Sequence, residues 1–200
     1  MNSTTPAPTR SARRRFGARA AAVVLAAAAL VGITRTAIDL AVGYVTERHQ
    51  FGRPIGSFQA VKHMLADVMV KTEYARSHVH RAAYSIAHDA PARSVDASMA
   101  KIAACEAALA AGRASLQVHG AIGYTYEQDV HVWMKRAWSL DLAFGTGAWH
   151  RARVADAVID AAPRVDAACE CEGRQICSGG ECLEPDTCET HRDCLDARIC

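Results

Sequence analysis

The feature that most limits how this chain can fold is a set of long stretches in which apolar residues recur every three or four positions. The first stretch runs to a stop at Gly52-Arg53-Pro54, and no proline or glycine cluster interrupts it before that point. Its apolar positions are Ile33, Ala37, Leu40, Ala41, Tyr44 and Val45. This spacing predicts a long α-helix with one face packed against other helices.

Two more long helices are predicted from their caps and stops. Ser57 is placed to cap a second helix that ends near Asp89-Ala90-Pro91. Ser94 is placed to cap a third, with Asp96 in its first turn, where the helix dipole favours a negative charge, and Gly120–Gly123 breaks it. The predicted buried stripes are Phe58, Val61, Leu65, Val68, Met69, Thr72, Ala75, Val79, Ala83 and Ile86, then Met99, Ile102, Cys105, Leu109, Gly112 and Leu116.

Two shorter helices follow, from about Asp129 to Leu140 and from about Thr146 to Asp160, before Pro163. Half of the residues are hydrophobic and only 6% are aromatic. Alanine carries much of the hydrophobic share, which favours closely packed helices, and no alternating run is long enough to predict a strand. The predicted fold class is therefore all-α, an antiparallel four-helix bundle joined by short loops.

Arginine and cysteine are spread unevenly, and they divide the chain into three parts. Residues 1–17 are predicted to be a disordered basic leader, residues 18–162 the helical bundle and residues 163–200 an irregular cysteine-rich tail. Seven of the eight cysteines lie in the tail, and the other, Cys105, lies on a predicted core stripe. The net charge of +2 gives no reason to expect nucleic-acid binding.

The apolar run from Ala20 to Val31 has two interpretations. A basic stretch before a short apolar run is typical of a secretory signal, and Arg13-Arg14-Arg15-Phe16 resembles a twin-arginine leader. The run is too short for a stable membrane span, however, and it continues without a gap into the first helix. We therefore expect a buried, alanine-rich helix in a cytoplasmic protein. The alternative is an exported structural or interaction protein that reuses a helical bundle and adds a disulfide-stapled tail.

The cysteine-rich tail lacks the apolar residues needed for a core. Most of its cysteines are separated by four or five residues, so disulfides are expected rather than a metal, with the pairing left open. The tail loosely resembles the cysteine-rich repeats of secreted bacterial proteins. In the middle part, no metal site is expected either, because its histidines have no carboxylate or cysteine at a suitable spacing.

Two motifs in the middle part point to a function. The first, residues 47–63, reads ERHQFGRPIGSFQAVKH, and the second, residues 117–125, reads QVHGAIGYT. They flank two predicted long helices. Together they resemble the hallmarks of the C-terminal helical domain of flavin-dependent acyl-CoA dehydrogenases, and the resemblance covers roughly two thirds of the chain.

The resemblance implies an FAD cofactor and an acyl-CoA substrate, which that family oxidises between Cα and Cβ. Complete relatives add an N-terminal helical domain and a middle β-domain, and their FAD lies between the middle domain and a bundle, with contacts from a neighbouring subunit. The FAD contacts that the resemblance implies for this chain are Arg48, Gln50, Phe51, Gln59, Gln117, Val118, His119, Gly120, Ala121 and Thr146.

The chemistry of these residues suits a dinucleotide. The planar guanidinium of Arg48 can pair with a pyrophosphate. Gln50 and Gln59 can bond to ribose or adenine, and Phe51 can pack on an aromatic ring. The alternative is that Arg48 only caps a helix and the glycines only form turns.

One departure from the family bears on catalysis. Where the family usually carries a catalytic glutamate before a Gly-Thr pair, this chain has Phe144 before Gly145-Thr146, and phenylalanine cannot accept a proton. The alternative position for the base, on the first bundle helix, falls in Ala26–Leu30 and holds no carboxylate. Asp141 is expected to be a solvated or capping residue. No catalytic residue is therefore predicted, and we expect a homo- or hetero-oligomer in which another subunit supplies the missing domains.

Overall fold

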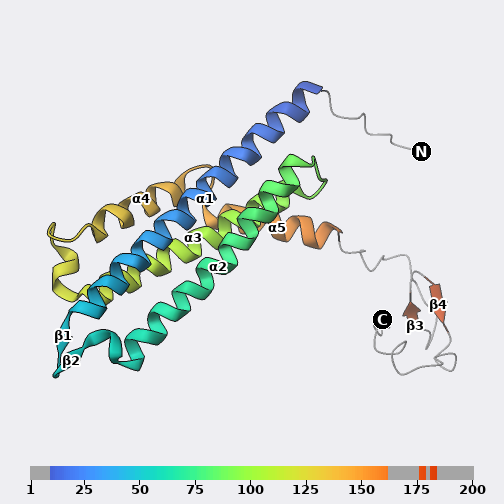
Figure 1. The fold of residues 1–200 in the computed structure, drawn as a ribbon. Coiled ribbons are helices and arrows are strands. Elements are labelled where there is room, and N and C mark those ends of the chain that lie inside the picture. Colours follow the sequence, from blue (N-terminus) through green and yellow to red (C-terminus); the bar gives the residue numbers. More distant parts are fainter. Residues whose placement is uncertain (1–9, 162–175, 179–180, 184–200) are drawn as a thin grey trace. The chain divides into compact units, whose positions relative to one another are not determined.

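The structure, a computed structural model, describes residues 10–161, 176–178 and 181–183, with side chains described for residues 18–159. The chain divides into two units, residues 1–155 and 156–200. The described helices are α1 (Arg10–Glu47), α2 (Gln59–Ala87), α3 (Arg93–His119), α4 (Val130–Leu142) and α5 (Gly147–Ala161). The predicted all-α class is confirmed (Figure 1).

Helix α3 is the central element of the first unit. Its most extensive contacts are with α1 and α2, which also contact each other, and α4 packs on both α3 and α1. Short connections join α1 to α2 and α2 to α3, so these three long helices alternate in direction and lie side by side (Figure 1). The first motif begins at the last residue of α1, and the second begins in the last turn of α3.

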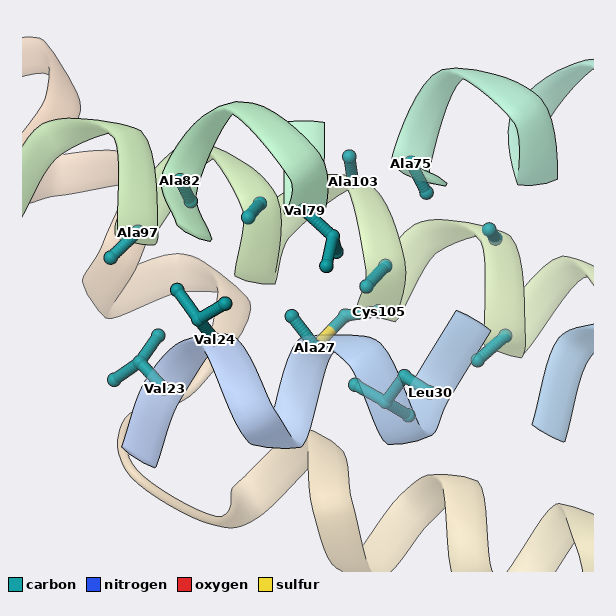
Figure 2. Close-up of a cluster of buried hydrophobic side chains, with 14 of the residues drawn as sticks. Val23, Val24, Ala27, Leu30, Ala75, Val79, Ala82, Ala97, Ala103 and Cys105 are labelled. Atoms are coloured by element: carbon teal, nitrogen blue, oxygen red, sulfur yellow. The ribbon is translucent and has the colours of Figure 1, made fainter. Parts of the chain in front are cut away.

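The side chains buried around α3 are mostly alanine. In the largest cluster, Ala103 and Cys105 of α3 lie among Ala27 and Leu30 of α1 and Val79 of α2 (Figure 2). A methyl side chain lets two helix axes approach to the short end of the usual 8–10 Å range. The helices are therefore closely packed, and a larger side chain at one of these alanines would clash with the neighbouring helix.

Asp96 ties the start of α3 to α2. It lies in the first turn of α3, as predicted, but it is also buried, with 5% of its surface exposed. Its Oδ1 accepts a hydrogen bond from Arg81 Nε at 3.0 Å, and its Oδ2 accepts one from Ser85 Oγ at 2.5 Å. The carboxylate thus joins two helices in addition to facing the positive end of one.

Both predicted serine caps are wrong. Helix α2 begins after Phe58, because Ser57 is taken up by a 3₁₀ turn, η1 (Ile55–Ser57), and no side chain caps α2. Helix α3 begins after Ala92, and Ser94 lies inside the helix, where its hydroxyl accepts a hydrogen bond from Arg153 instead. In each case a nearby proline fixes a turn that sets the start of the helix.

Helix α1 begins at Arg10, so residues 10–17, which the sequence predicts to be part of a disordered leader, are helical. The cause is composition, since alanine and arginine are among the strongest helix formers. By length and hydropathy, Ala18–Glu47 could cross a membrane, but half of its most apolar stretch is buried in the bundle. This burial favours the interpretation as a core helix over that as an export signal.

The predicted stripes agree only in part with the residues that are buried. On α2 the buried residue is Ala82, and the predicted Ala83 is exposed. On α3 burial extends around most of the helix, whereas Met99, Ile102, Leu109 and Leu116 of the predicted stripe are only half-buried. A central helix contacts neighbours on several sides, so a single stripe could not describe it.

Short strands occur at two places that the sequence did not predict. In the first unit, β1 (His49–Gln50) pairs with β2 (Arg53–Pro54), and in the second, β3 (Ile176–Ser178) pairs with β4 (Glu181–Leu183). The β3–β4 hairpin corrects the prediction of a wholly irregular tail, and it sets Cys177 opposite Cys182. The disulfides expected in the tail stay a prediction, because most of the tail lies outside the described residues.

The close packing around α3 predicts that an enlarged side chain there destabilises the bundle. Ala104 has no exposed surface, so Ala104→Leu should lower the free energy of unfolding by about 1–3 kcal/mol through overpacking. Ala66→Leu, on the exposed side of α2, is the control and should change it by less than about 0.5 kcal/mol. Urea unfolding followed by circular dichroism measures both, and equal effects would contradict the packing described here.

Candidate functional site

The β1–β2 hairpin exposes an aromatic side chain at a strained turn. Phe51 and Gly52 form its tip with φ angles of 55° and 78°. A left-handed backbone is unfavourable for phenylalanine by about 1–2 kcal/mol. Phe51 is nevertheless 90% exposed, and its ring meets only the edge of Phe58, with 6.1 Å between centroids. Strain combined with exposure of this kind is typical of a binding residue.

Arg48 lies between the end of α1 and this hairpin. Its backbone N–H donates to Tyr44 O, and its carbonyl accepts from Ile55 N at 2.8 Å, which closes the hairpin. Its side chain is exposed and forms no ion pair with another described residue. Gln50 and Gln59, on either side of the hairpin, are exposed as well.

The turn after α3 carries the second motif. Gln117 and Ala121 are exposed, and Gly120 has a φ of 64° with open space where a side chain would point. Val118 and His119, by contrast, are buried, with 8% and 4% of their surfaces exposed. A ligand could therefore contact these last two mainly through their backbone.

A stacked pair holds the two motifs at one end of the bundle. The ring of His119 lies on that of Tyr44, with centroids 4.4 Å apart, and His119 Nδ1 donates to Ser115 O. Tyr44 is one helical turn before Arg48, and His119 immediately precedes Gly120. The structure therefore brings together the predicted contacts of both motifs (Figure 1).

Thr146 lies apart from the other predicted contacts. Its hydroxyl accepts a hydrogen bond from Trp149 N at 3.3 Å, so it caps the start of α5. Phe144, two residues before Thr146, faces the opposite end of α1, near Val23. Val23 and Arg48 are separated by roughly 35–40 Å at 1.5 Å per helical residue. One chain therefore does not bring Thr146 to the hairpin.

Phe144, where the family resemblance would place a glutamate, lines a cavity. It has a φ of 60° and is 58% exposed. The cavity has a volume of about 670 Å³, and its walls include Val23, Ala97 and Trp149. No carboxylate lines it, so the described residues provide no proton acceptor at this position.

A buried histidine, which the sequence did not single out as a site residue, holds the Phe144 loop. His150 has no exposed surface, its Nε2 lies 3.2 Å from Phe144 O and its Nδ1 lies 3.0 Å from Ser98 Oγ. Burial lowers its pKa to about 4, and the nearby positive charges of Lys101 and Arg153 add to this shift. A neutral ring then donates to the Phe144 carbonyl and accepts from Ser98 on α3.

Lys101 is a second buried polar residue, and it contacts the C-terminal end of α4. Lys101 is fully buried, and its Nζ donates to the carbonyls of Leu140 and Asp141, where the negative end of the α4 dipole lies. Burial, assisted by Asp141, raises the pKa of Cys105 to about 12. Asp141 is half-buried, and its backbone carbonyl is one of the two that accept from Lys101. The one sequence signal for this group is a lysine inside a run of alanines.

No three histidine, cysteine, aspartate or glutamate side chains gather at metal-binding distances among the described residues. The absence of a metal site remains a prediction.

Comparison with known proteins decides the family. The family model for the acyl-CoA dehydrogenase C-terminal domain matches residues 15–159. This chain belongs to the acyl-CoA dehydrogenase family. The matched residues contain both motifs and all five helices except the first five residues of α1 and the last two of α5.

Individual acyl-CoA dehydrogenases and their structures agree with this assignment. Acyl-CoA dehydrogenase IpdE2 of Mycolicibacterium smegmatis is 44% identical over 116 residues, which is 58% of this chain and 35% of that protein. The glutaryl-coenzyme A dehydrogenase–glutaryl-CoA complex is 31% identical with a TM-score of 0.69, covering 77% of this chain and 39% of that one. The ChsE4–ChsE5 complex from Mycobacterium tuberculosis is 26% identical with a TM-score of 0.67, covering 71% and 38%.

The chain thus spans 35–39% of the length of these proteins. The shared part is the helical bundle with its two motifs.

The burial of His150 predicts a specific pH dependence of stability. Between pH 6.5 and 4 the unfolded chain binds a proton on His150 that the folded chain does not, so stability falls as the pH is lowered through this window. The loss should reach at most about 3 kcal/mol. His150→Gln should remove this component, so its stability should depend less steeply on pH than that of the wild type. Urea unfolding at several pH values measures this, and parallel profiles would contradict it.

Proposed function

We propose that this chain is the flavin-contacting C-terminal domain of an acyl-CoA dehydrogenase and that it binds FAD at the end of the bundle that carries the two motifs. The observation that carries the proposal is the exposed, strained Phe51 beside Arg48, at the same end as the open turn at Gly120. Members of the family are FAD-dependent oxidoreductases. When bound, FAD supplies the acceptor for a hydride from the acyl group.

The described residues fit an extended dinucleotide. Arg48 offers a planar set of donors for a pyrophosphate, and Gln50, Gln59 and Gln117 offer exposed amides for ribose or adenine. Phe51 offers an apolar ring that a flat heterocycle would cover. At Gly120 the absence of a side chain lets the backbone approach a ligand closely. Val118 and His119 hold this turn in place from the core.

Oxidation of an acyl-CoA requires groups that the described residues do not provide. Position 144 holds a phenylalanine, so a base for the α-proton has to come from elsewhere. We propose that the chain works in an oligomer whose other subunit contributes the base. The similarity to a chain of the ChsE4–ChsE5 complex supports an assembly of unlike subunits.

The separation of Thr146 from the hairpin also favours an oligomer. Contact between Thr146 and FAD would require a site shared between subunits. Each bundle would then contribute its hairpin end to one FAD and its Thr146 end to another. We propose a cytoplasmic location, which is supported by the partial burial of the apolar stretch of α1.

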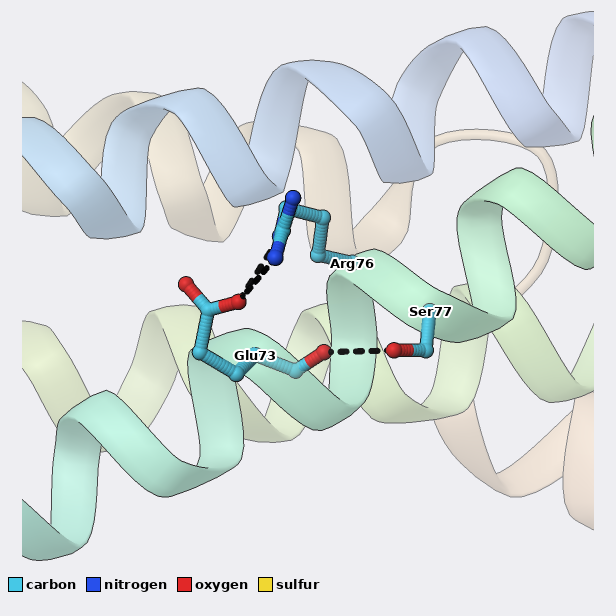
Figure 3. Close-up of polar contacts among 3 residues, drawn as sticks. All are labelled: Glu73, Arg76 and Ser77. Atoms are coloured by element: carbon cyan, nitrogen blue, oxygen red, sulfur yellow. Dashed lines mark hydrogen bonds and ion pairs between the residues drawn. The ribbon is translucent and has the colours of Figure 1, made fainter.

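FAD binding by the purified chain tests the proposal. Quenching of FAD fluorescence should show saturable binding, and Arg48→Gln should weaken it roughly tenfold or more, because a charge-assisted hydrogen bond to the pyrophosphate is lost. The matched control is Arg76→Gln on α2. Arg76 forms an exposed ion pair with Glu73, with 2.5 Å between Nη2 and Oε2, and this pair contributes little to stability (Figure 3).

Equal binding by wild type, Arg48→Gln and Arg76→Gln would show that FAD does not use the hairpin. If the wild type does not bind FAD alone, repeating the titration with a second acyl-CoA dehydrogenase subunit present decides between half a site and no site.

A further inference from the structure

The β3–β4 hairpin of the second unit places two cysteines opposite each other. In the antiparallel register of the two strands, Cys177 is the partner of Cys182. Opposite residues in an antiparallel pair belong to the same face of the ladder, with Cα atoms about 4.5 or 5.5 Å apart. A disulfide spans Cα separations of about 4.4–6.8 Å. The backbone of the hairpin therefore sets these two positions at a spacing that a disulfide closes.

The connection between the two strands suits this register. Two residues, Gly179 and Gly180, lie between the end of β3 and the start of β4. Two-residue hairpin connections require backbone conformations with positive φ, which glycine adopts without strain. A short connection also fixes the register, because a slip by one residue would move the two cysteines to opposite faces. The pair of glycines thus favours the pairing of Cys177 with Cys182.

A hairpin of this size needs a further constraint to be stable. Each strand has three residues, and an isolated two-stranded hairpin is at best marginally stable in water. Besides the cysteines, its apolar residues are Ile176 and Leu183, which form one cross-strand pair. One such pair cannot provide a hydrophobic core. A cross-strand disulfide supplies the constraint by limiting the conformations of the unfolded segment.

The register also favours this pairing over the alternatives in residues 163–200. Two thiols that a hairpin holds opposite each other have a higher effective concentration than thiols joined only by a flexible chain. A zinc site needs four ligands, and the two cysteine positions of the hairpin supply half of them. The cysteines that compete for the same partners are Cys169, Cys171, Cys188, Cys194 and Cys200.

We propose that Cys177 and Cys182 form a reversible disulfide that closes the β3–β4 hairpin. The thiolate of one cysteine attacks a low-molecular-weight disulfide such as oxidised glutathione and releases one glutathione. The second cysteine attacks the resulting mixed disulfide, forms the Cys177–Cys182 bond and releases the second glutathione. The two cysteines lose two electrons and two protons, which the two glutathione molecules take up. The pair does not involve the FAD contacts.

Reversibility follows from the location proposed for the chain. In a reducing compartment, protein disulfides are usually transient and respond to the redox state of the thiol pool. The hairpin is then closed when the pool is oxidised, and it loses its covalent constraint when the pool is reduced.

Peptide mapping of the wild-type full chain tests the pairing. The chain is equilibrated with oxidised glutathione, alkylated and digested with trypsin without reduction. Trypsin cleaves after Arg174 and Arg192, so residues 175–192 form one peptide with three cysteines, Cys177, Cys182 and Cys188. Fragmentation of this peptide should show a link between Cys177 and Cys182 that reduction opens. A main product in which either of them is bonded to any other cysteine would overturn the proposal.

A titration with reduced and oxidised glutathione tests whether the hairpin causes the pairing. It measures the effective concentration of the two thiols in a full chain whose five competing tail cysteines are changed to serine. Moving the second thiol by one residue, with Cys182→Ser and Leu183→Cys, should lower the effective concentration about tenfold or more. Gly179→Val with Gly180→Val, which keeps the ring size but disfavours the turn, should lower it similarly. Ser178→Thr, the matched control, keeps register and glycines and should change it less than about threefold.

Two further results would overturn the proposal. Equal effective concentrations in the in-register and shifted chains would show that the cysteines pair only because they are close in sequence. Stoichiometric zinc in the purified chain, with both cysteines protected from alkylation until a chelator is added, would show a metal site instead. The wild-type peptide map contains no substitution, so it decides the pairing if the serine changes disturb the tail. FAD titration of the oxidised and reduced chain keeps a failure here distinct from a failure of the flavin proposal.

Discussion

The close packing of α3 against α1 and α2 is the constraint on which the rest of the structure depends. Alanines at the helix contacts allow three long helices to lie near one another, and few large apolar side chains support the core. Because the contacts are short, polar groups that enter this core need partners at defined positions. Asp96, Lys101 and His150 each find theirs on another helix or in the loop that precedes α5.

The two ends of the long helices consequently carry different chemistry. At one end, the Tyr44–His119 stack fixes the hairpin and the turn after α3, and exposed side chains suited to a dinucleotide gather there. At the other end, His150 holds the loop of Phe144 beside an apolar cavity with two arginines. Phe144, in the loop beside this cavity, has a left-handed backbone and an apolar side chain that cannot accept a proton.

Hydrophobic periodicity and helix-breaking residues predicted the helices and their approximate ends well, because glycine and proline affect the backbone at their own positions. They failed where tertiary contacts decide: Ser94 bonds to Arg153, which is distant in sequence, and α3 is buried on several sides rather than along one stripe. The motifs predicted the exposed residues Arg48, Phe51 and Gln117 as a group, and the structure places them at one end. Sequence alone could not show that His119 is buried, that Thr146 lies far away, or that His150 and Lys101 form internal contacts, since each depends on which helices meet.

The central claim is that the hairpin and the turn after α3 form one FAD-binding surface. Hydrogen–deuterium exchange of the chain with and without saturating FAD tests it most directly. The account predicts slower exchange of backbone amides in two separate segments, residues 48–59 and residues 117–121, at the same FAD concentration. Unchanged exchange in either segment while FAD is bound would contradict it.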